Sequence, residues 1–115
     1  MNSDLRAPLA RLAFQLRLDL ALHNIMTTCL RDETPGARLR QFGMMVLLMD
    51  LAAREAPLTV STIVETTGMT RGAVEQVLSA LDERGLIAAQ WTKNSSGRGK
   101  ARLYRLTVGP DADRV

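Results

Sequence analysis

The first quarter of the chain repeats apolar residues at the spacing of an amphipathic helix, which predicts one helix from Asp4 to about Leu30. One stripe recurs at steps of three and four residues and consists of Leu5, Leu9, Leu12, Leu16 and Leu20. A second set lies on another side and consists of Phe14, Leu18, Ala21, Leu22 and Ile25. Such a helix would be roughly 40 Å long, more than a small core covers. We therefore assign Leu5, Leu9, Leu12 and Leu16 to a dimer interface.

A second helix is predicted to begin after Thr34, an N-cap followed by Pro35 at the first helical position, and to run to about Glu55. Its stretch 42–53 is apolar almost all round, so we expect it to be the buried hub of the fold. Four methionines fall in the first two helices. They are expected to fill the core, and the alternative is that they line an adaptable ligand pocket.

Two shorter helices are predicted next. Thr59 caps the third, in which Ile63 and Val64 face inward, and Gly68 breaks it. Thr70 caps the fourth, residues 70–84, and Gly85 ends it. The inward stripe of this fourth helix consists of Val74, Val77, Leu78 and Leu81.

The pattern after Gly85 becomes extended and predicts a hairpin. One strand covers 86–92 with Ile87, Ala89 and Trp91 on one side, a polar turn covers 93–100, and a second strand covers 101–107. We expect Trp91 and Tyr104 to pack under the hairpin. The predicted fold class is mainly α with a small β-hairpin wing, within a single domain. Its parts are the N-terminal helices (1–56), a helix-turn-helix with its wing (57–108) and a polar tail (109–115).

Positive charge is concentrated in the hairpin. Residues 1–83 have a net charge of −2, whereas residues 84–110 carry six basic residues and no acidic one. The six are Arg84, Lys93, Arg98, Lys100, Arg102 and Arg105. Such a segment is typical of a surface that binds a polyanion, although charged residues also protect exposed strand edges.

Composition excludes several other classes. With Cys29 as the sole cysteine and His23 as the sole histidine, a disulfide framework, a metal site and histidine-based catalysis are not expected. Cys29 is interpreted as a small core residue rather than a redox sensor, and Asp19 and His23 as a surface pair. The apolar runs are too short for a membrane helix and no secretory signal is present. We expect a cytoplasmic protein that is not an enzyme and has no cofactor.

The order of short helix, turn, helix and basic hairpin is that of a winged helix-turn-helix. The residues LTVSTIVETTGMTRGAVEQVLSALDERGLI, from Leu58 to Ile87, resemble the bacterial MarR-type transcriptional regulators. The likeness continues through the hairpin to Leu106 and Thr107, and the two preceding helices fit the family's order. It implies a homodimeric repressor that binds double-stranded DNA at a pseudo-palindromic operator. The resemblance also implies a prokaryotic, nucleoid-associated protein. MarR-type proteins usually also dimerise through C-terminal helices, which this sequence lacks.

In that arrangement, helix 70–84 enters the major groove and the wing 93–100 contacts the minor groove or phosphates. The expected DNA-binding residues are Thr70, Arg71, Gly72, Glu75, Gln76, Ser79, Lys93, Arg98, Lys100 and Arg102. Arg71 suits guanine and Gln76 suits adenine, whereas Ser79 suits a phosphate. Glu75 either pairs with Arg71 at i,i+4, which we favour, or accepts a hydrogen bond from cytosine. The alternative function is a protein-interaction module that binds nucleic acid only non-specifically. A small apolar effector bound between the methionine-rich helices is a further, weaker hypothesis.

Overall fold

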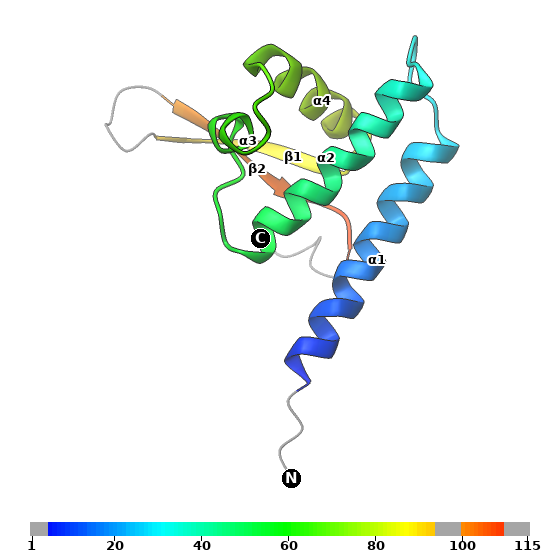
Figure 1. Cartoon of the computed structure of the whole chain (residues 1–115), viewed down its shortest axis with the longest axis vertical. Coiled ribbons are helices and arrows are strands. Elements are labelled where there is room, and N and C mark those ends of the chain that lie inside the picture. The colour runs from blue at the N-terminus through cyan, green and yellow to red at the C-terminus, as the bar shows by residue number, and fades with distance from the viewer. Residues whose placement is uncertain (1–4, 94–99, 110–115) are drawn as a thin grey trace.

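The computed structural model describes residues 5–93 and 100–109, which form four helices followed by a two-stranded sheet (Figure 1). The elements are α1 (Arg6–Thr27), α2 (Pro35–Ala53), α3 (Val60–Thr67), α4 (Arg71–Glu83), β1 (Ile87–Lys93) and β2 (Lys100–Leu106). The predicted class, mainly helical with a small antiparallel hairpin, is confirmed. No helix in these ranges is both long and apolar enough to cross a membrane.

Two helices end earlier than predicted. α1 stops at Thr27 instead of Leu30, where Thr28 turns extended and its carbonyl oxygen accepts a hydrogen bond from Arg84 at 2.6 Å. α2 stops at Ala53, because Glu55 has a left-handed backbone with φ of 58°. Both strands begin and end within one residue of the predicted positions.

The second helix is the hub of the fold. Thr34 caps it by accepting a hydrogen bond from the amide of Ala37 at 3.0 Å, and Pro35 opens it. α2 packs against both α1 and α4. Its contribution to the core consists of Met44, Met45, Leu48, Met49 and Leu51. The prediction that this apolar helix is buried is therefore confirmed.

Helices α3 and α4 pack against each other and are joined by a tight turn. The caps Thr59 and Thr70 each accept a hydrogen bond from the third amide of their helix at 3.2 Å. Gly68 ends α3 and Gly85 follows α4, both with φ of 76°, a conformation that favours glycine. The predicted inward stripe of α4 is entirely buried: Val74, Val77, Leu78 and Leu81.

The hairpin is antiparallel and places paired residues on the same face. Ile87 pairs with Leu106, Ala89 with Tyr104, and Trp91 with Arg102. Tyr104 is buried, and its amide donates a hydrogen bond to the carbonyl of Leu58, which ties β2 to the segment before α3. The predicted packing of both rings is thus right for Tyr104 and wrong for Trp91, which is 60% exposed. The outer end of the hairpin lies beyond the helices that cover its base.

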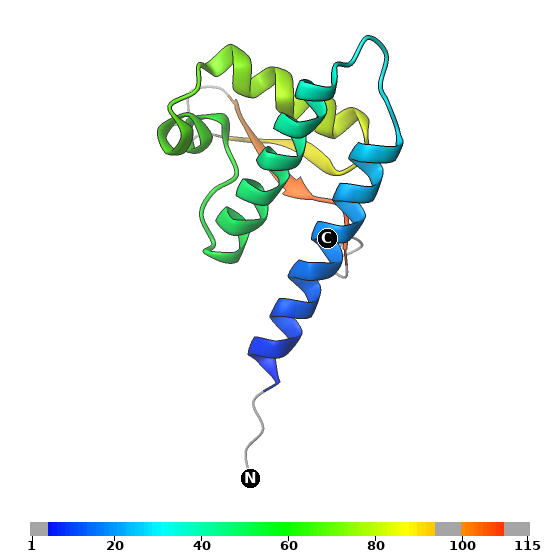
Figure 2. The same ribbon diagram turned by 45° about the vertical axis from the view of Figure 1, so that its right-hand side comes forward.

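The first helix is covered along only part of its length. Of the second apolar set, Ala21 and Ile25 are fully buried and Phe14 and Leu18 pack against the core, whereas Leu22 is exposed. The N-terminal half of α1 extends away from the other elements (Figures 1 and 2). The radius of gyration is accordingly 15.2 Å, compared with about 13 Å for a compact domain of this length.

Candidate nucleic-acid interface

The start of α4 presents a row of polar side chains to solvent. This outer face consists of five exposed residues: Arg71, Gly72, Glu75, Gln76 and Ser79. At 100° per residue they span an arc of about 140° opposite the buried stripe, with Arg71 at one edge and Gln76 at the other. Thr70, at the cap, is exposed as well. The sequence predicted the exposure of all six, because the apolar stripe leaves them no other side.

Glu75 lies beside Arg71, as the favoured interpretation requires. The guanidinium Nε of Arg71 is 3.9 Å from a carboxylate oxygen of Glu75, and both side chains remain largely exposed. Such a pair contributes at most about 1 kcal/mol to stability. Most of the donors of Arg71 stay open to solvent.

Gly72 has open space beside it. A Cβ atom placed on this glycine would meet no atom within 4 Å, so packing inside the chain does not require a glycine here. The first-turn amides of α4 also have no acceptor four residues earlier within the helix. Together they make the start of α4 a place where an anionic group can approach the backbone closely.

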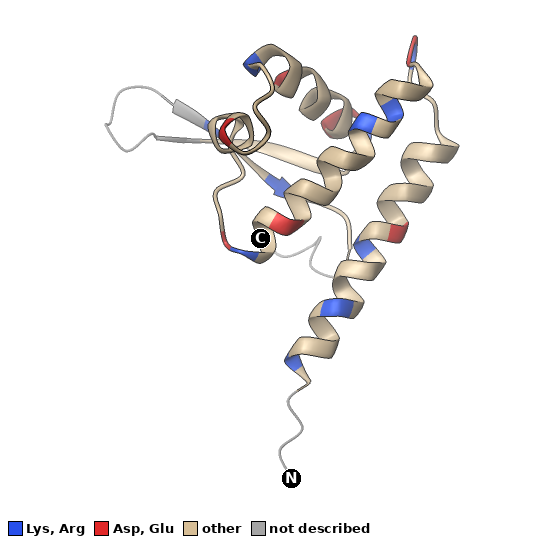
Figure 3. Ribbon diagram, in the orientation of Figure 1, with Lys and Arg blue, Asp and Glu red and all other residues tan. Residues whose placement is uncertain are grey.

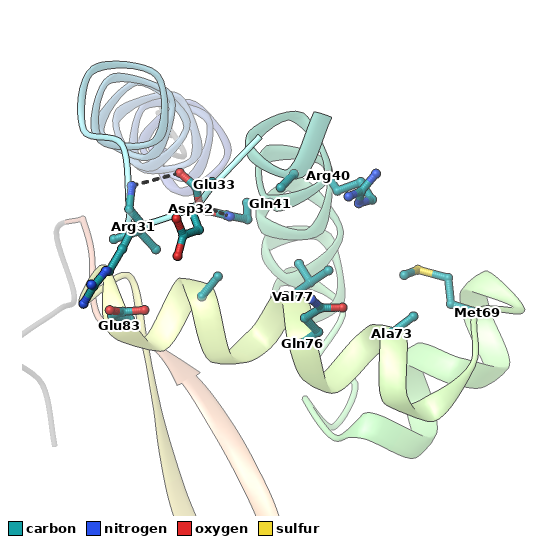
Figure 4. Close-up of a pocket in the computed structure, with 13 residues that line it drawn as sticks. Arg31, Asp32, Glu33, Arg40, Gln41, Met69, Ala73, Gln76, Val77 and Glu83 are labelled. Carbon is teal, nitrogen blue, oxygen red and sulfur yellow. Dashed lines mark hydrogen bonds between the residues drawn. The ribbon is translucent and has the colours of Figure 1, made fainter. Parts of the chain in front are cut away.

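Gln76 is one of the residues that line a hollow between α4, α2 and the loop 30–33 (Figure 4). The hollow has a volume of about 260 Å³, and residues of both charge signs line it. Gln76 and Val77 enter it from α4, opposite Gln41 on α2. The lining does not favour a ligand of either charge. The hollow therefore supports the effector hypothesis only by offering space for a small molecule.

The described part of the hairpin carries basic residues and no acidic ones (Figure 3). Arg102 and Arg105 are exposed. Lys93 and Lys100 pair at the outer end of the strands, but their side chains lie outside the described residues, as does the whole of Arg98. The predicted roles of these three residues therefore stay predictions.

Arg102 is held in place by two aromatic residues. Its guanidinium carbon lies 4.8 Å from the centre of the Trp91 ring, and its Nη1 donates a hydrogen bond to the Tyr104 hydroxyl at 3.2 Å. The hydrogen bond from Arg102 to Tyr104 raises the pKa of the guanidinium above its ordinary value, so Arg102 stays charged. Arg102 was expected at the interface from the sequence, whereas Trp91 was not expected as its partner.

A hollow separates the outer hairpin from the starts of α3 and α4. This hairpin hollow has a volume of about 270 Å³ and is bounded by Thr59, Val60, Ser61, Arg71, Glu75, Trp91 and Arg102. Two guanidinium groups and one carboxylate give it a net positive charge. It thus joins Arg71, from the outer face of α4, to Arg102 of the hairpin.

Arg84 does not belong to the basic surface, contrary to the charge pattern. Its side chain is 1% exposed, and Nη2 donates to Glu33, which is 5% exposed, at 2.5 Å. Nε donates to the side-chain oxygen of Gln41 at 2.5 Å, and Gln41 donates to the other Glu33 oxygen. This Arg84 cluster (Arg84, Glu33 and Gln41) joins the end of α4 to α2 and to the loop after α1. Of the described basic side chains of this segment, Arg102 and Arg105 are exposed and Arg84 is not.

The ionisation of Glu33 follows from this cluster. Burial acts to raise the pKa of the carboxyl group, but hydrogen bonds from Gln41 and the Leu30 amide oppose it, as do the charges of Arg84 and Arg38. The net effect is a pKa below the ordinary value. Sequence reasoning missed the cluster, because its members lie far apart and no local pattern links them.

The four leucines assigned to a dimer interface are all exposed, three on α1 and Leu5 as its N-cap. Leu5, Leu9, Leu12 and Leu16 are between 46% and 66% exposed, and Leu20 continues the row at 42%. Leaving so many leucines in water forgoes about 1.5–3 kcal/mol for each one that could be fully buried.

Two other interpretations are corrected or left without support. Cys29 is exposed and is not a core residue, because the loop after α1 turns its thiol toward the backbone oxygens of Leu30 and Glu33. Asp19 and His23 are both exposed on α1, and the interaction given for the Asp19 carboxylate is a hydrogen bond that it accepts from Gln15 at 3.0 Å. Among the described residues, no group of three or more histidine, cysteine or acidic side chains is placed to hold a metal.

Comparison with known proteins adds no relative: no family model, curated protein or solved structure matches this chain.

Proposed function

We propose that this chain is a sequence-specific transcriptional regulator that binds double-stranded DNA through a winged helix-turn-helix. The observation that carries the proposal is the outer face of α4, polar and open to solvent, next to a hairpin that carries basic and no acidic residues. The major groove accepts a helix of this kind, with the first turns nearest the base edges. Besides Glu75, the acidic residues on the same arc are Asp82 and Glu83, which lie about 16–18 Å further along the axis than Arg71, away from those turns.

In the proposed complex, side chains divide between base and phosphate contacts. Arg71 donates to guanine and Gln76 reads adenine, from opposite edges of the outer face. Thr70, Ser79 and the hairpin cations, including Lys93, Arg98 and Lys100, contact phosphates or the minor groove. Gly72 lets the helix backbone approach the duplex. Glu75 orients Arg71.

We propose a homodimer that acts as a repressor on a pseudo-palindromic operator. The exposed leucine row of α1 and the extension of this helix beyond the rest of the fold support pairing of two copies through α1. A two-fold dimer presents two copies of α4, and its half-sites would lie about one helical turn apart. Blocking access of the polymerase is the simplest consequence of occupying such a site.

Selection of bound duplexes from a random pool tests the proposal. We expect a pseudo-palindromic sequence, lower affinity in the Arg71→Ala and Arg98→Ala variants, and relaxed preference at one position by about 1–3 kcal/mol in Gln76→Ala. Arg54→Ala is the matched control, because Arg54 is as exposed as Arg71 and also pairs with an acid four residues away, at the far end of α2. Failure to recover any duplex at moderate salt contradicts the proposal.

The second candidate, a protein-interaction module, is favoured by Glu75. Its carboxylate is about half exposed on the outer face of α4, where it repels phosphates unless Arg71 neutralises it. A ratio near one between the affinities for selected and random duplexes would support this candidate over the first.

A further inference from the structure

Trp91 occupies an unusual position for a large aromatic residue. It lies on the hairpin face that buries Ile87 and Tyr104, yet it is 60% exposed, because the hairpin continues past the helices that cover those two residues. A ring left in water on a small domain forgoes much of its possible burial, and exposed tryptophans are enriched where partners bind.

The residues around Trp91 indicate which chemical group could bind beside it. Arg102 covers part of the ring, and the ring borders the hairpin hollow with Arg71 and Ser61. The hollow offers the held guanidinium of Arg102, the exposed guanidinium of Arg71 and a hydroxyl, against the single carboxylate of Glu75. This excess of positive charge suits a phosphodiester, and the remaining apolar ring surface suits the sugar next to it. Free bases are not exposed in a duplex, so base stacking on Trp91 is not required.

We propose that the hairpin hollow receives a backbone phosphate of the bound DNA, between Arg71 and Arg102, while Trp91 packs against the adjacent deoxyribose. This inference rests on the proposed function and deepens it by assigning a binding role to Trp91. The contact is to the backbone, so it positions the duplex and carries no sequence preference. It also connects the wing to the start of α4 through one strand of the DNA.

Trp91 is the only tryptophan of the chain, so its fluorescence reports on this site alone. The probe is a duplex of about 25 base pairs, long enough for two half-sites one turn apart. It is used in two forms, the selected sequence and a random one. We expect both to change the emission of the wild-type protein on binding and to reduce quenching by acrylamide severalfold.

Variants separate a binding role from a structural one. Trp91→Ala is expected to weaken binding of both duplexes by about tenfold, as loss of an anchoring aromatic does, and Trp91→Phe to lose less. Gln90→Ala, on the opposite face of the same strand, is the matched control and keeps full affinity. Circular dichroism and thermal melting verify that each variant is folded.

The outcomes for the inference and for the function are distinct. Duplex binding with unchanged Trp91 emission and acrylamide quenching, or full affinity in a folded Trp91→Ala variant, overturns the role of Trp91 and leaves the proposed function standing. A loss confined to the selected duplex overturns the backbone contact, since a sequence-specific role would then be at work. If the wild-type protein binds neither duplex in gel shifts, the proposed function itself fails.

Discussion

At the scale of single residues, two helical glycines allow a clean comparison. Gly72 in α4 and Gly43 in α2 are both exposed, and a Cβ atom at either would meet nothing within 4 Å. Glycine inside a helix is less favourable than alanine by about 0.5–1 kcal/mol. Packing within the chain therefore requires neither glycine. The proposed complex requires a glycine only at Gly72, because only there would a side chain stand between the helix and the DNA.

We predict that Gly72→Ala stabilises the fold but weakens binding to the selected duplex. The stability gain is at most about 1 kcal/mol, and the added methyl group costs about 1 kcal/mol or more at a closely packed interface. Gly43→Ala should show a similar gain in urea denaturation with unchanged affinity in gel shifts. Equal affinities for the two variants would contradict close approach of DNA to Gly72.

At the scale of elements, the Arg84 cluster decides how α4 is held. The pair Arg84–Glu33 is almost fully buried, and hydrogen bonds from Arg84 reach the backbone oxygens of Thr28 and Asn24. Removing one member leaves an uncompensated buried charge, whereas removing both does not. The cluster therefore acts as a unit that joins the end of α4 to the loop after α1.

A double-mutant cycle tests this unit. Arg84→Met and Glu33→Gln are each expected to lower the free energy of unfolding by about 3–5 kcal/mol, and the double variant by less than the sum. Urea denaturation measures all three. The exposed pair Arg54–Asp50 is the control, and its single variants should cost no more than about 1 kcal/mol. Additive losses at Arg84 and Glu33 would mean that the two act independently.

The cluster also predicts a dependence of stability on pH. The pKa of Glu33 is lowered by folding from its ordinary value of 4.5, so the stabilisation by its ionised form is complete above about pH 4.5. It is lost as the pH falls through the lowered value. The difference in unfolding free energy between wild type and the double variant should thus be constant from pH 7 to 5 and shrink below 4.5. A difference that persists unchanged to pH 3 would refute the role of the charge.

At the scale of the whole molecule, the row of exposed leucines on α1 supports the proposed pairing of two copies. Leu12 is 66% exposed in the middle of the row, and Leu39 at the start of α2 is 65% exposed outside it. Because Leu12 and Leu39 are equally exposed, substituting each one separates the effect of disrupting the leucine row from the effect of removing any exposed leucine.

We predict that Leu12→Glu yields monomers in analytical ultracentrifugation and that Leu39→Glu does not. If each copy neutralises about four phosphates, the slope of log affinity against log salt should be near −7 for the dimer and about half that for the monomer. Dissociation caused by Leu39→Glu instead would move the interface to α2. A wild-type chain that sediments as a monomer at all concentrations would exclude the dimer.

The sequence by itself determined the helices and strands, the caps Thr59 and Thr70, the glycine turns and the outer face of α4. These features depend on residues within about four positions of one another, where periodicity and capping act. Only the tertiary structure decided that Arg84 is neutralised by Glu33, that Cys29 faces solvent and that Trp91 is uncovered. An ion pair between residues 51 positions apart has no local signal, and whether a ring is covered depends on where the neighbouring helices end.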